Sequence, residues 1–253
     1  MVLTGFGINC DYETQYAFFK AGSVARRVHV NDLIERPGLL AEYQILALPG
    51  GFSFGDDIAS GKVLANKMRY RLGRALESFL EAGGLVIGIC NGFQVLVRLG
   101  LLPDGRSGLG RQRVSLTYND SGKFEDRWVH LEAENRMDCV FTRGIDRLEL
   151  PVRHGEGKFV ADTEETLEEL ERSGQVVLRY CTPGGGQPEY PENPNGSVNA
   201  VAGICDLTGR VFGLMPHPEA FLHRSQHPRW TRQKLVEQGQ GMAIFRNAVA
   251  YFE

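Results

Sequence analysis

Residues 85–99 read Leu-Val-Ile-Gly-Ile-Cys-Asn-Gly-Phe-Gln-Val-Leu-Val-Arg-Leu. The run Leu85–Ile89 is continuously apolar, which is typical of a strand buried on both faces of a sheet. The residues after Cys90 predict a helix that begins directly where the strand ends. A buried strand that leads straight into a helix predicts an α/β fold with a mostly parallel sheet.

The chain before this stretch repeats the same alternation. Gly22, Pro49 and the pair Gly83-Gly84 end the predicted elements, and the apolar residues of the helix before Gly83 are spaced to bury one face. We therefore expect a parallel sheet flanked by helices in the first hundred residues. The predicted strands are Val2–Phe6, Val24–Val30 and Ile45–Leu48, and the predicted helices run from about residue 11 to Ala21 and over Arg69–Ala82.

The pattern changes after Arg111, where short β segments dominate. Asn119–Gly122 and Leu207–Gly209 have the composition of hairpin turns. Thr182–Ser197 is rich in Gly, Pro and Asn, and we interpret it as a site loop between two strands. The sequence thus predicts an antiparallel β extension within one domain over residues 1–253. The predicted strands are Gln112–Tyr118, Arg127–Glu132, Val176–Cys181, Ala200–Cys205 and Val211–Met215, with helices at Glu164–Glu171 and Ala243–Tyr251.

Composition narrows the function classes. The 253 residues carry 28 Lys and Arg against 31 Asp and Glu, a net charge of -3 that argues against nucleic-acid binding as the main activity. The apolar runs are far shorter than the roughly 20 residues that cross a bilayer, and the first residues do not read as a signal peptide. We expect a cytoplasmic protein with no membrane partner. None of the five cysteines forms a C-x-x-C pair, so most should be buried apolar residues.

Cys90 is the exception among these cysteines. Gly88-Ile-Cys90-Asn-Gly92 has the form of a nucleophile elbow, in which glycines relieve a sharp strand-to-helix turn and the nucleophile projects from the sheet. The helix N-terminus favours a thiolate, and the N–H of Asn91 would point to where an oxyanion forms. The alternative is a buried cysteine whose glycines serve only close packing.

Two further stretches support the catalytic interpretation. Met215-Pro-His217-Pro-Glu219 presents an imidazole and a carboxylate on one side of an extended segment, so that the acid can orient the base. Alone, this pair would be read as a surface His and a solvated Glu. Leu48-Pro-Gly-Gly51 follows a predicted strand, and a glycine N–H there could complete an oxyanion hole with Asn91. A plain glycine turn is the alternative.

Along the chain the order is the Gly-Gly loop, then the cysteine elbow, then His-Pro-Glu, and in this order the three elements resemble the class I glutamine amidotransferases, whose fold is flavodoxin-like. Several other stretches are similar to the glutaminase subunits of a purine-biosynthetic synthase. They are Gly7–Asp11, Gly50–Asp56, Cys90–Gln94, His154–Phe159, Tyr190–Ser197 and Gly213–Glu219.

The resemblance implies a role for each matching residue. Cys90 would be the nucleophile, His217 the general base and then acid, and Glu219 the carboxylate that orients it. Gly51 and Asn91 would supply the oxyanion hole. The remaining pair, Gln94 and His154, would bind the glutamine substrate.

The resemblance also implies partners, a large synthetase subunit and a small bridging subunit. Gly55–Val63 fails as a phosphate-binding loop because Gly61-Lys62 is followed by valine, so we expect no cofactor on this chain and place ATP and magnesium on the synthetase. His223 and His227 lack the rest of a metal motif, so we expect no metal. Rival functions are an amidotransferase of another pathway, a free-standing γ-glutamyl hydrolase, or a non-catalytic binding module.

Overall fold

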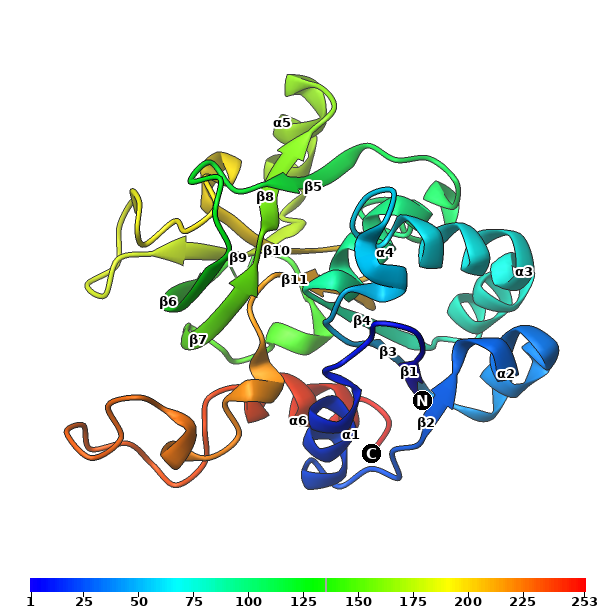
Figure 1. Ribbon diagram of the computed structural model, residues 1–253, viewed down its shortest axis with the longest axis horizontal. Helices are drawn as coiled ribbons and strands as arrows, with labels where there is room; N and C mark the ends of the chain where they lie inside the picture. Colours follow the sequence, from blue (N-terminus) through cyan, green and yellow to red (C-terminus); the bar gives the residue numbers. More distant parts are fainter. Residues whose placement is uncertain (135) are drawn as a thin grey trace.

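The computed structural model describes residues 1–134 and 136–253. Within them, nine strands form one mixed sheet in the order β2-β1-β3-β4-β11-β10-β9-β6-β7, and β5 pairs with β8 in a separate small sheet. Figure 1 shows helices on the parallel end of the large sheet and a β-rich region beside it. The predicted α/β class with an antiparallel extension is therefore confirmed.

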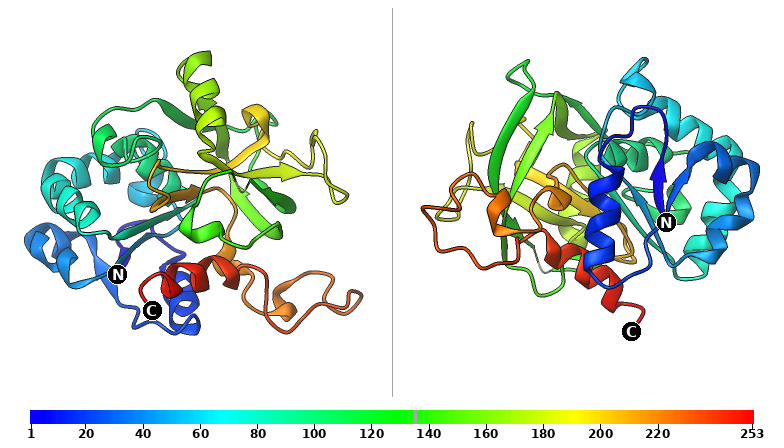
Figure 2. Two further views of the ribbon diagram at one scale, coloured as in Figure 1. Left: turned by 180° about the vertical axis from the view of Figure 1, so that it is seen from behind. Right: turned by 60° about the horizontal axis from the view of Figure 1, so that its bottom comes forward.

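The parallel half runs from β2 to β11. Strand β4, between β3 and β11, is buried along its whole length, as its continuous apolar sequence predicts. Helices α1 and α6 pack against each other on one face, and α3 packs against α4 on the other (Figures 1 and 2). The strands are β1 (Val2–Thr4), β2 (Arg27–His29), β3 (Ile45–Leu48), β4 (Leu85–Ile89) and β11 (Val211–Leu214), and the helices are α1 (Asp11–Lys20), α2 (Val30–Glu35), α3 (Lys62–Glu81), α4 (Asn91–Leu99) and α6 (Met242–Ala250).

The antiparallel half continues from β11. The turn at Leu207–Gly209 joins β10 to β11 as a hairpin, as predicted. The antiparallel half consists of β10 (Val201–Cys205), β9 (Val176–Cys181), β6 (Glu125–Ala133) and β7 (Arg147–His154). In the view of Figure 1, β5 (Val114–Tyr118), β8 (Glu156–Ala161) and α5 (Glu164–Ser173) lie above these strands. Short 3₁₀ segments lie at Pro37–Glu42, Ser53–Asp56, Gly105–Gly108, Val140–Thr142, Val198–Ala200, Pro218–Ala220 and Arg224–Gln226.

Two strands and one helix were missing from the sequence-based assignment. Strand β7 contains Pro151, which normally argues against a strand but is tolerated here because β7 is the edge of the sheet. Strand β8 was hidden inside a stretch that reads as a site motif. Helix α2 takes over at Val30, inside the predicted strand, and is capped by the His29 ring, whose Nδ1 accepts a hydrogen bond from the Asn31 amide at 3.2 Å.

Other boundaries and one connection also differ. Helix α3 begins at Lys62, seven residues before the predicted start, after Gly61 in a left-handed conformation. The Asn119–Gly122 turn exists, with the Gly122 amide donating to the Asn119 carbonyl, but it is not a hairpin. Its flanking strands β5 and β6 pair with β8 and with β7 and β9 instead.

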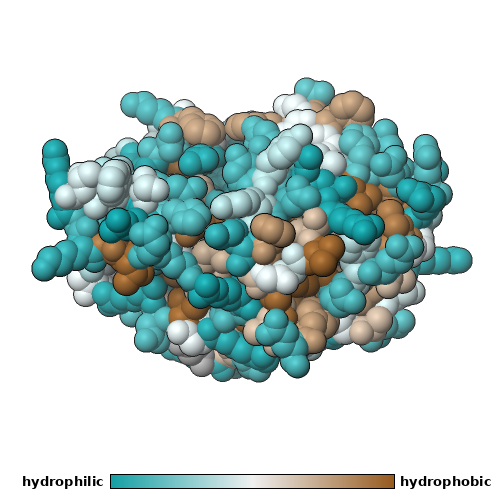
Figure 3. All heavy atoms as spheres, turned by 90° about the horizontal axis from the view of Figure 1, so that it is seen from below, coloured by the Kyte–Doolittle hydropathy of each residue, from teal (hydrophilic) through white to brown (hydrophobic). Residues whose placement is uncertain are grey.

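The segment between β11 and α6 leaves the body of the molecule as a long excursion (Figure 2), closed by a bridge between His223 and Gln238. The buried ring of His227 holds it, with Nε2 at 3.2 Å from Glu149 and its ring against Trp128. On the face drawn in Figure 3, hydrophobic residues lie in separate patches among hydrophilic ones. Over residues 1–134 and 136–253, no helix is long and apolar enough to cross a membrane.

Candidate active site

Cys90 lies at the turn between β4 and α4, with φ 50° and ψ −106°. A positive φ is rare for a residue with a side chain and marks stored strain. The flanking glycines are required by close packing, because a Cβ on Gly88 would lie 2.6 Å from the Gly92 carbonyl oxygen and one on Gly92 would lie 1.9 Å from that of Leu48. This is the predicted elbow geometry. The other cysteines are free thiols without such strain, and all except Cys10 are buried.

His217 and Glu219 follow β11, the strand paired with β4. The two strands run in parallel register, with Leu214 opposite Ile89, so both elements deliver their last residues to the same edge of the sheet. The His217 Nδ1 lies 2.6 Å from the Glu219 Oε1, and both side chains are only 2% exposed. The backbone of His217 is fixed separately by its amide, which donates to the Pro151 carbonyl at 2.8 Å.

The electrostatics of His217 suit a catalytic base. Burial alone lowers the pKa of its imidazole, but the Glu219 carboxylate and the Cys90 sulfur outweigh it and hold that pKa well above the usual value. Because Nδ1 is occupied by Glu219, Nε2 is the free nitrogen, and it has no hydrogen-bond partner in the described part of the chain. The arrangement leaves one nitrogen to exchange protons with Cys90 or with a substrate.

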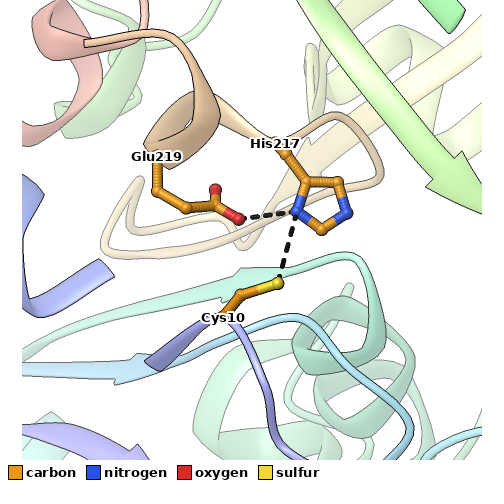
Figure 4. A group of neighbouring side chains, drawn as sticks. All are labelled: Cys10, His217 and Glu219. Carbon is orange, nitrogen blue, oxygen red and sulfur yellow. Dashed lines mark hydrogen bonds and ion pairs between the residues drawn. The ribbon is translucent and has the colours of Figure 1, made fainter. Parts of the chain in front are cut away.

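A second sulfur lies close to the same imidazole. The Cys10 Sγ is 4.0 Å from the His217 Nδ1, and Figure 4 shows it on the side of the ring that faces Glu219. Burial raises the pKa of the Cys10 thiol, and its backbone has an ordinary negative φ. Cys10, His217 and Glu219 form a compact group of potential metal ligands. Cys10 nevertheless faces the nitrogen already bonded to the acid, whereas Cys90 has the strained elbow and helix N-terminus of a nucleophile.

The two amides predicted for the oxyanion hole follow the neighbouring parallel strands β3 and β4 at the same edge of the sheet. Asn91 is the first residue of α4, so its N–H lies at the helix N-terminus. Gly51 has φ 142°. An antiparallel bridge pairs Gly51 with Ile8, and the amides that donate its hydrogen bonds are those of Asn9 and Phe52. The Gly51 amide is therefore not used in this bridge. Gly51 and Cys90 both line a cavity of about 370 Å³, together with Gln94, His154 and residues of the β5–β6 turn.

The two predicted substrate-binding residues lie in the wall of this cavity. The Gln94 Nε2 donates to the Glu156 carbonyl at 2.6 Å, and its Oε1 accepts from the Asn91 side chain at 2.9 Å. His154 is buried against Asn119, whose Oδ1 lies 3.2 Å from Nδ1. Burial, with a smaller contribution from nearby His217, lowers the pKa of His154 to about 3, so its ring is neutral.

Sequence reasoning overlooked several residues of this cavity, including Asp56, Arg153 and Glu156. The Cys90 thiol donates to the Arg153 carbonyl at 3.6 Å, a backbone contact that no side-chain pattern could reveal. The 182–197 loop, predicted to be a site loop, contributes none of the described residues that line this cavity. Some of its residues, such as Gly186 and Asn193, line a second cavity of about 770 Å³ next to Arg179.

Comparison with known proteins defines the class. Residues 1–252 match the CobB/CobQ-like glutamine amidotransferase domain, the class to which the elbow and the His-Glu pair also point. The chain is 49% identical to phosphoribosylformylglycinamidine synthase subunit PurQ of Dehalococcoides mccartyi, covering 99% of this chain and 96% of that protein. It is 44% identical to the PurQ subunit of Methanococcus maripaludis strain S2, covering 100% and 96%.

A solved structure agrees. The PurLQS structure from Thermotoga maritima contains a chain that is 30% identical, with a TM-score of 0.73 and coverage of 100% of this chain and 97% of that one. The chain therefore belongs to the family of PurQ subunits of phosphoribosylformylglycinamidine synthase.

Proposed function

We propose that this chain is the glutaminase subunit of a phosphoribosylformylglycinamidine synthase. It hydrolyses glutamine to glutamate and ammonia and passes the ammonia to a synthetase subunit, which uses it with ATP to convert formylglycinamide ribonucleotide to formylglycinamidine ribonucleotide. The observation that carries the proposal is the placement of the His217 imidazole. Its Nδ1 lies 2.6 Å from the Glu219 carboxylate, and the nearby Cys90 sulfur helps to raise its pKa.

The first half of the reaction is attack by the Cys90 thiolate on the side-chain amide carbon of glutamine. The C–S bond forms and the carbonyl becomes an oxyanion, which the amides of Gly51 and Asn91 stabilise. Protonated His217 gives its Nε2 proton to the departing nitrogen, so the C–N bond breaks and ammonia leaves. Glu219 stabilises the imidazolium that exists between these steps.

The second half of the reaction hydrolyses the thioester and regenerates the free enzyme. His217, now neutral, takes a proton from water as that water attacks the thioester carbonyl. The tetrahedral intermediate collapses, the C–S bond breaks, and glutamate leaves while Cys90 returns to its starting state. Gln94 and His154 bind the amino-acid end of the substrate through the cavity wall, with His154 acting as a neutral group.

The ammonia needs an acceptor that this chain does not provide. We place ATP and magnesium on a PurL-type synthetase, with a PurS-type small subunit in the same complex, and we place the complex in the cytoplasm. Two exposed aromatic residues form part of the cavity rim, Phe52 at 47% and Phe124 at 54% exposed, with their rings 6.4 Å apart. Such a rim suits a partner surface that would shield ammonia from water.

The test is to purify the chain alone and with its co-expressed synthetase and small subunit. We expect weak glutamine hydrolysis from the isolated chain and strong hydrolysis, coupled to ATP-dependent product formation, from the complex. Ammonium salts should replace glutamine in the complex when Cys90 is changed to serine. Strong hydrolysis by the isolated chain would favour a γ-glutamyl hydrolase, and no glutamine-dependent turnover in the complex would contradict the proposal.

A binding module on the same fold makes a different prediction. A glutamine-like chloroketone should label Cys90 stoichiometrically, and the Cys90→Ser variant should not be labelled. If Cys90 reacts no faster than Cys139, which is buried and serves as the internal comparison, the catalytic interpretation is wrong.

A further inference from the structure

The side-chain amide of Asn91 connects three separate parts of the site. Its Oδ1 accepts a hydrogen bond from the Ser53 amide at 3.1 Å. Its Nδ2 donates to the Asp56 Oδ1 at 3.0 Å and to the Gln94 Oε1 at 2.9 Å. The residue is 1% exposed, and the polar atoms of its amide are all engaged. An amide used so completely fixes the relative positions of its partners.

The loop that this amide holds does not adopt a relaxed conformation. Phe54 has φ 55° and Asp56 has φ 52°, both in the left-handed region that residues with side chains rarely occupy. Strained backbone of this kind persists only where surrounding contacts hold it. The Gly61 amide contributes one such contact by donating to the Asp56 Oδ1 at 3.1 Å. Asn91 contributes two, at Ser53 and at Asp56.

This geometry ties together the two donors of the oxyanion hole. One donor is the backbone N–H of Asn91 itself, and the other is that of Gly51, two residues before the Ser53 amide that the Asn91 side chain binds. The two amides belong to distant parts of the sequence, and the Asn91 side chain joins those parts directly.

We propose that the Asn91 side chain is a positioning residue that sets the separation of the two oxyanion-hole amides. This inference rests on the proposed glutaminase function. The Asn91 side chain is buried and both of its polar atoms are already bonded within the protein, so it acts through the loop and not by touching glutamine. The role differs from that of its backbone N–H, which any residue at this position would retain.

The Asn91→Ala variant in the assembled synthase complex separates the two roles. It keeps the backbone N–H and removes the side-chain hydrogen bonds to Ser53, Asp56 and Gln94. Loss of a well-placed oxyanion donor costs about 10²–10³-fold in kcat, so a displaced donor should cost about 10–100-fold. The KM for glutamine should change less than about 3-fold, because Gln94 keeps its hydrogen bond to the Glu156 carbonyl. Ammonia-dependent turnover should be unchanged.

Glutamate γ-semialdehyde provides a readout that a merely structural role would not move. The Cys90 thiol adds across its carbonyl, and the resulting oxygen occupies the oxyanion hole. Its inhibition constant should rise in Asn91→Ala by about the same factor as kcat falls. Asn247→Ala is the matched control, since that side chain also donates two hydrogen bonds, to the carbonyls of Phe141 and Arg143, on a helix outside the cavity. It should leave both constants unchanged.

Asp56→Ala is the second variant, for the case in which Asn91→Ala does not fold. It removes the hydrogen bond between the side chains of Asn91 and Asp56, and it should lower kcat by a smaller factor than Asn91→Ala does. Combined with Asn91→Ala it should add little, because partners in one contact are not additive. The inference fails if Asn91→Ala is fully labelled by the chloroketone and retains wild-type kcat, if only KM changes, or if the two substitutions add. Failure of the wild-type complex to use glutamine would instead contradict the proposed function.

Discussion

Gly50 lies beside the imidazole of His217, and adding one methyl group there tests the geometry of the site. An ideal Cβ on Gly50 would lie 2.7 Å from the His217 Cε1 and 3.4 Å from the Cys10 Sγ. Gly50 does not have a left-handed φ, so the backbone itself accepts alanine. Carbon atoms in contact need about 3.5 Å, so the ring must move by roughly 0.8 Å.

The direction of that movement decides the effect on catalysis. Cε1 joins the two ring nitrogens, so the methyl group must disturb the bond from Nδ1 to Glu219, the placement of Nε2, or both. A misplacement of about 1 Å costs about 10²-fold in rate. We therefore expect Gly50→Ala to lower glutamine-dependent kcat by about 30- to 100-fold.

The assay compares glutamine-dependent and ammonia-dependent turnover in the assembled complex. Ammonia-dependent turnover should stay at the wild-type level, since only the glutaminase site is altered. Gly38→Ala is the control, because its Cβ would meet nothing within 4 Å and its φ is also ordinary. Our reasoning is wrong if folded Gly50→Ala retains a kcat within about 3-fold of wild type.

Three further experiments test the roles assigned above. Cys90→Ser should abolish glutamine hydrolysis while Cys10→Ser stays within a few-fold of wild type, and the reverse order would make Cys10 the nucleophile. Glu219→Gln should lower the pKa of His217, followed by NMR titration, and reduce kcat by about 10⁴-fold, the loss found when a triad carboxylate becomes an amide. His154 has its folded pKa lowered to about 3 by burial, so the unfolded chain binds the proton more tightly. Its contribution to stability is complete above about pH 6.5, the unfolded pKa, and is lost as the pH falls toward 3. Urea denaturation of the wild type should therefore show a larger loss of stability from pH 7 to pH 5 than that of His154→Gln, and equal losses would rule this account out.

The sequence was most informative where one local pattern determines one local structure. The apolar run Leu85–Ile89 identified the buried strand, and Gly88 and Gly92 identified the sharp turn. A Cβ on Gly92 would collide with Leu48, and one on Gly88 would collide with Gly92. The pairing of His217 with Glu219 followed from their spacing. Each of these predictions depends on neighbouring residues alone.

Long-range contacts were not predictable in this way. Pro151 hid strand β7, since its acceptability depends on β7 being an edge, which is a property of the whole sheet. In the sequence, Asn91 looks like an ordinary polar residue at the start of a helix. The hydrogen bond from the Ser53 amide to its side chain forms only when the loop at Ser53 folds against it. Cys10 comes within 4.0 Å of His217 from the opposite end of the sequence.

The pairing of β4 with β11 has a consequence for how this enzyme can change. Sulfur and imidazole are carried by adjacent hydrogen-bonded strands, with the Cys90 amide itself donating to the Leu214 carbonyl at 2.8 Å. Their separation is therefore fixed by the spacing of a sheet and is insensitive to loop length. A change of length in a loop that carries neither group would therefore leave the distance between the sulfur and the imidazole unaltered.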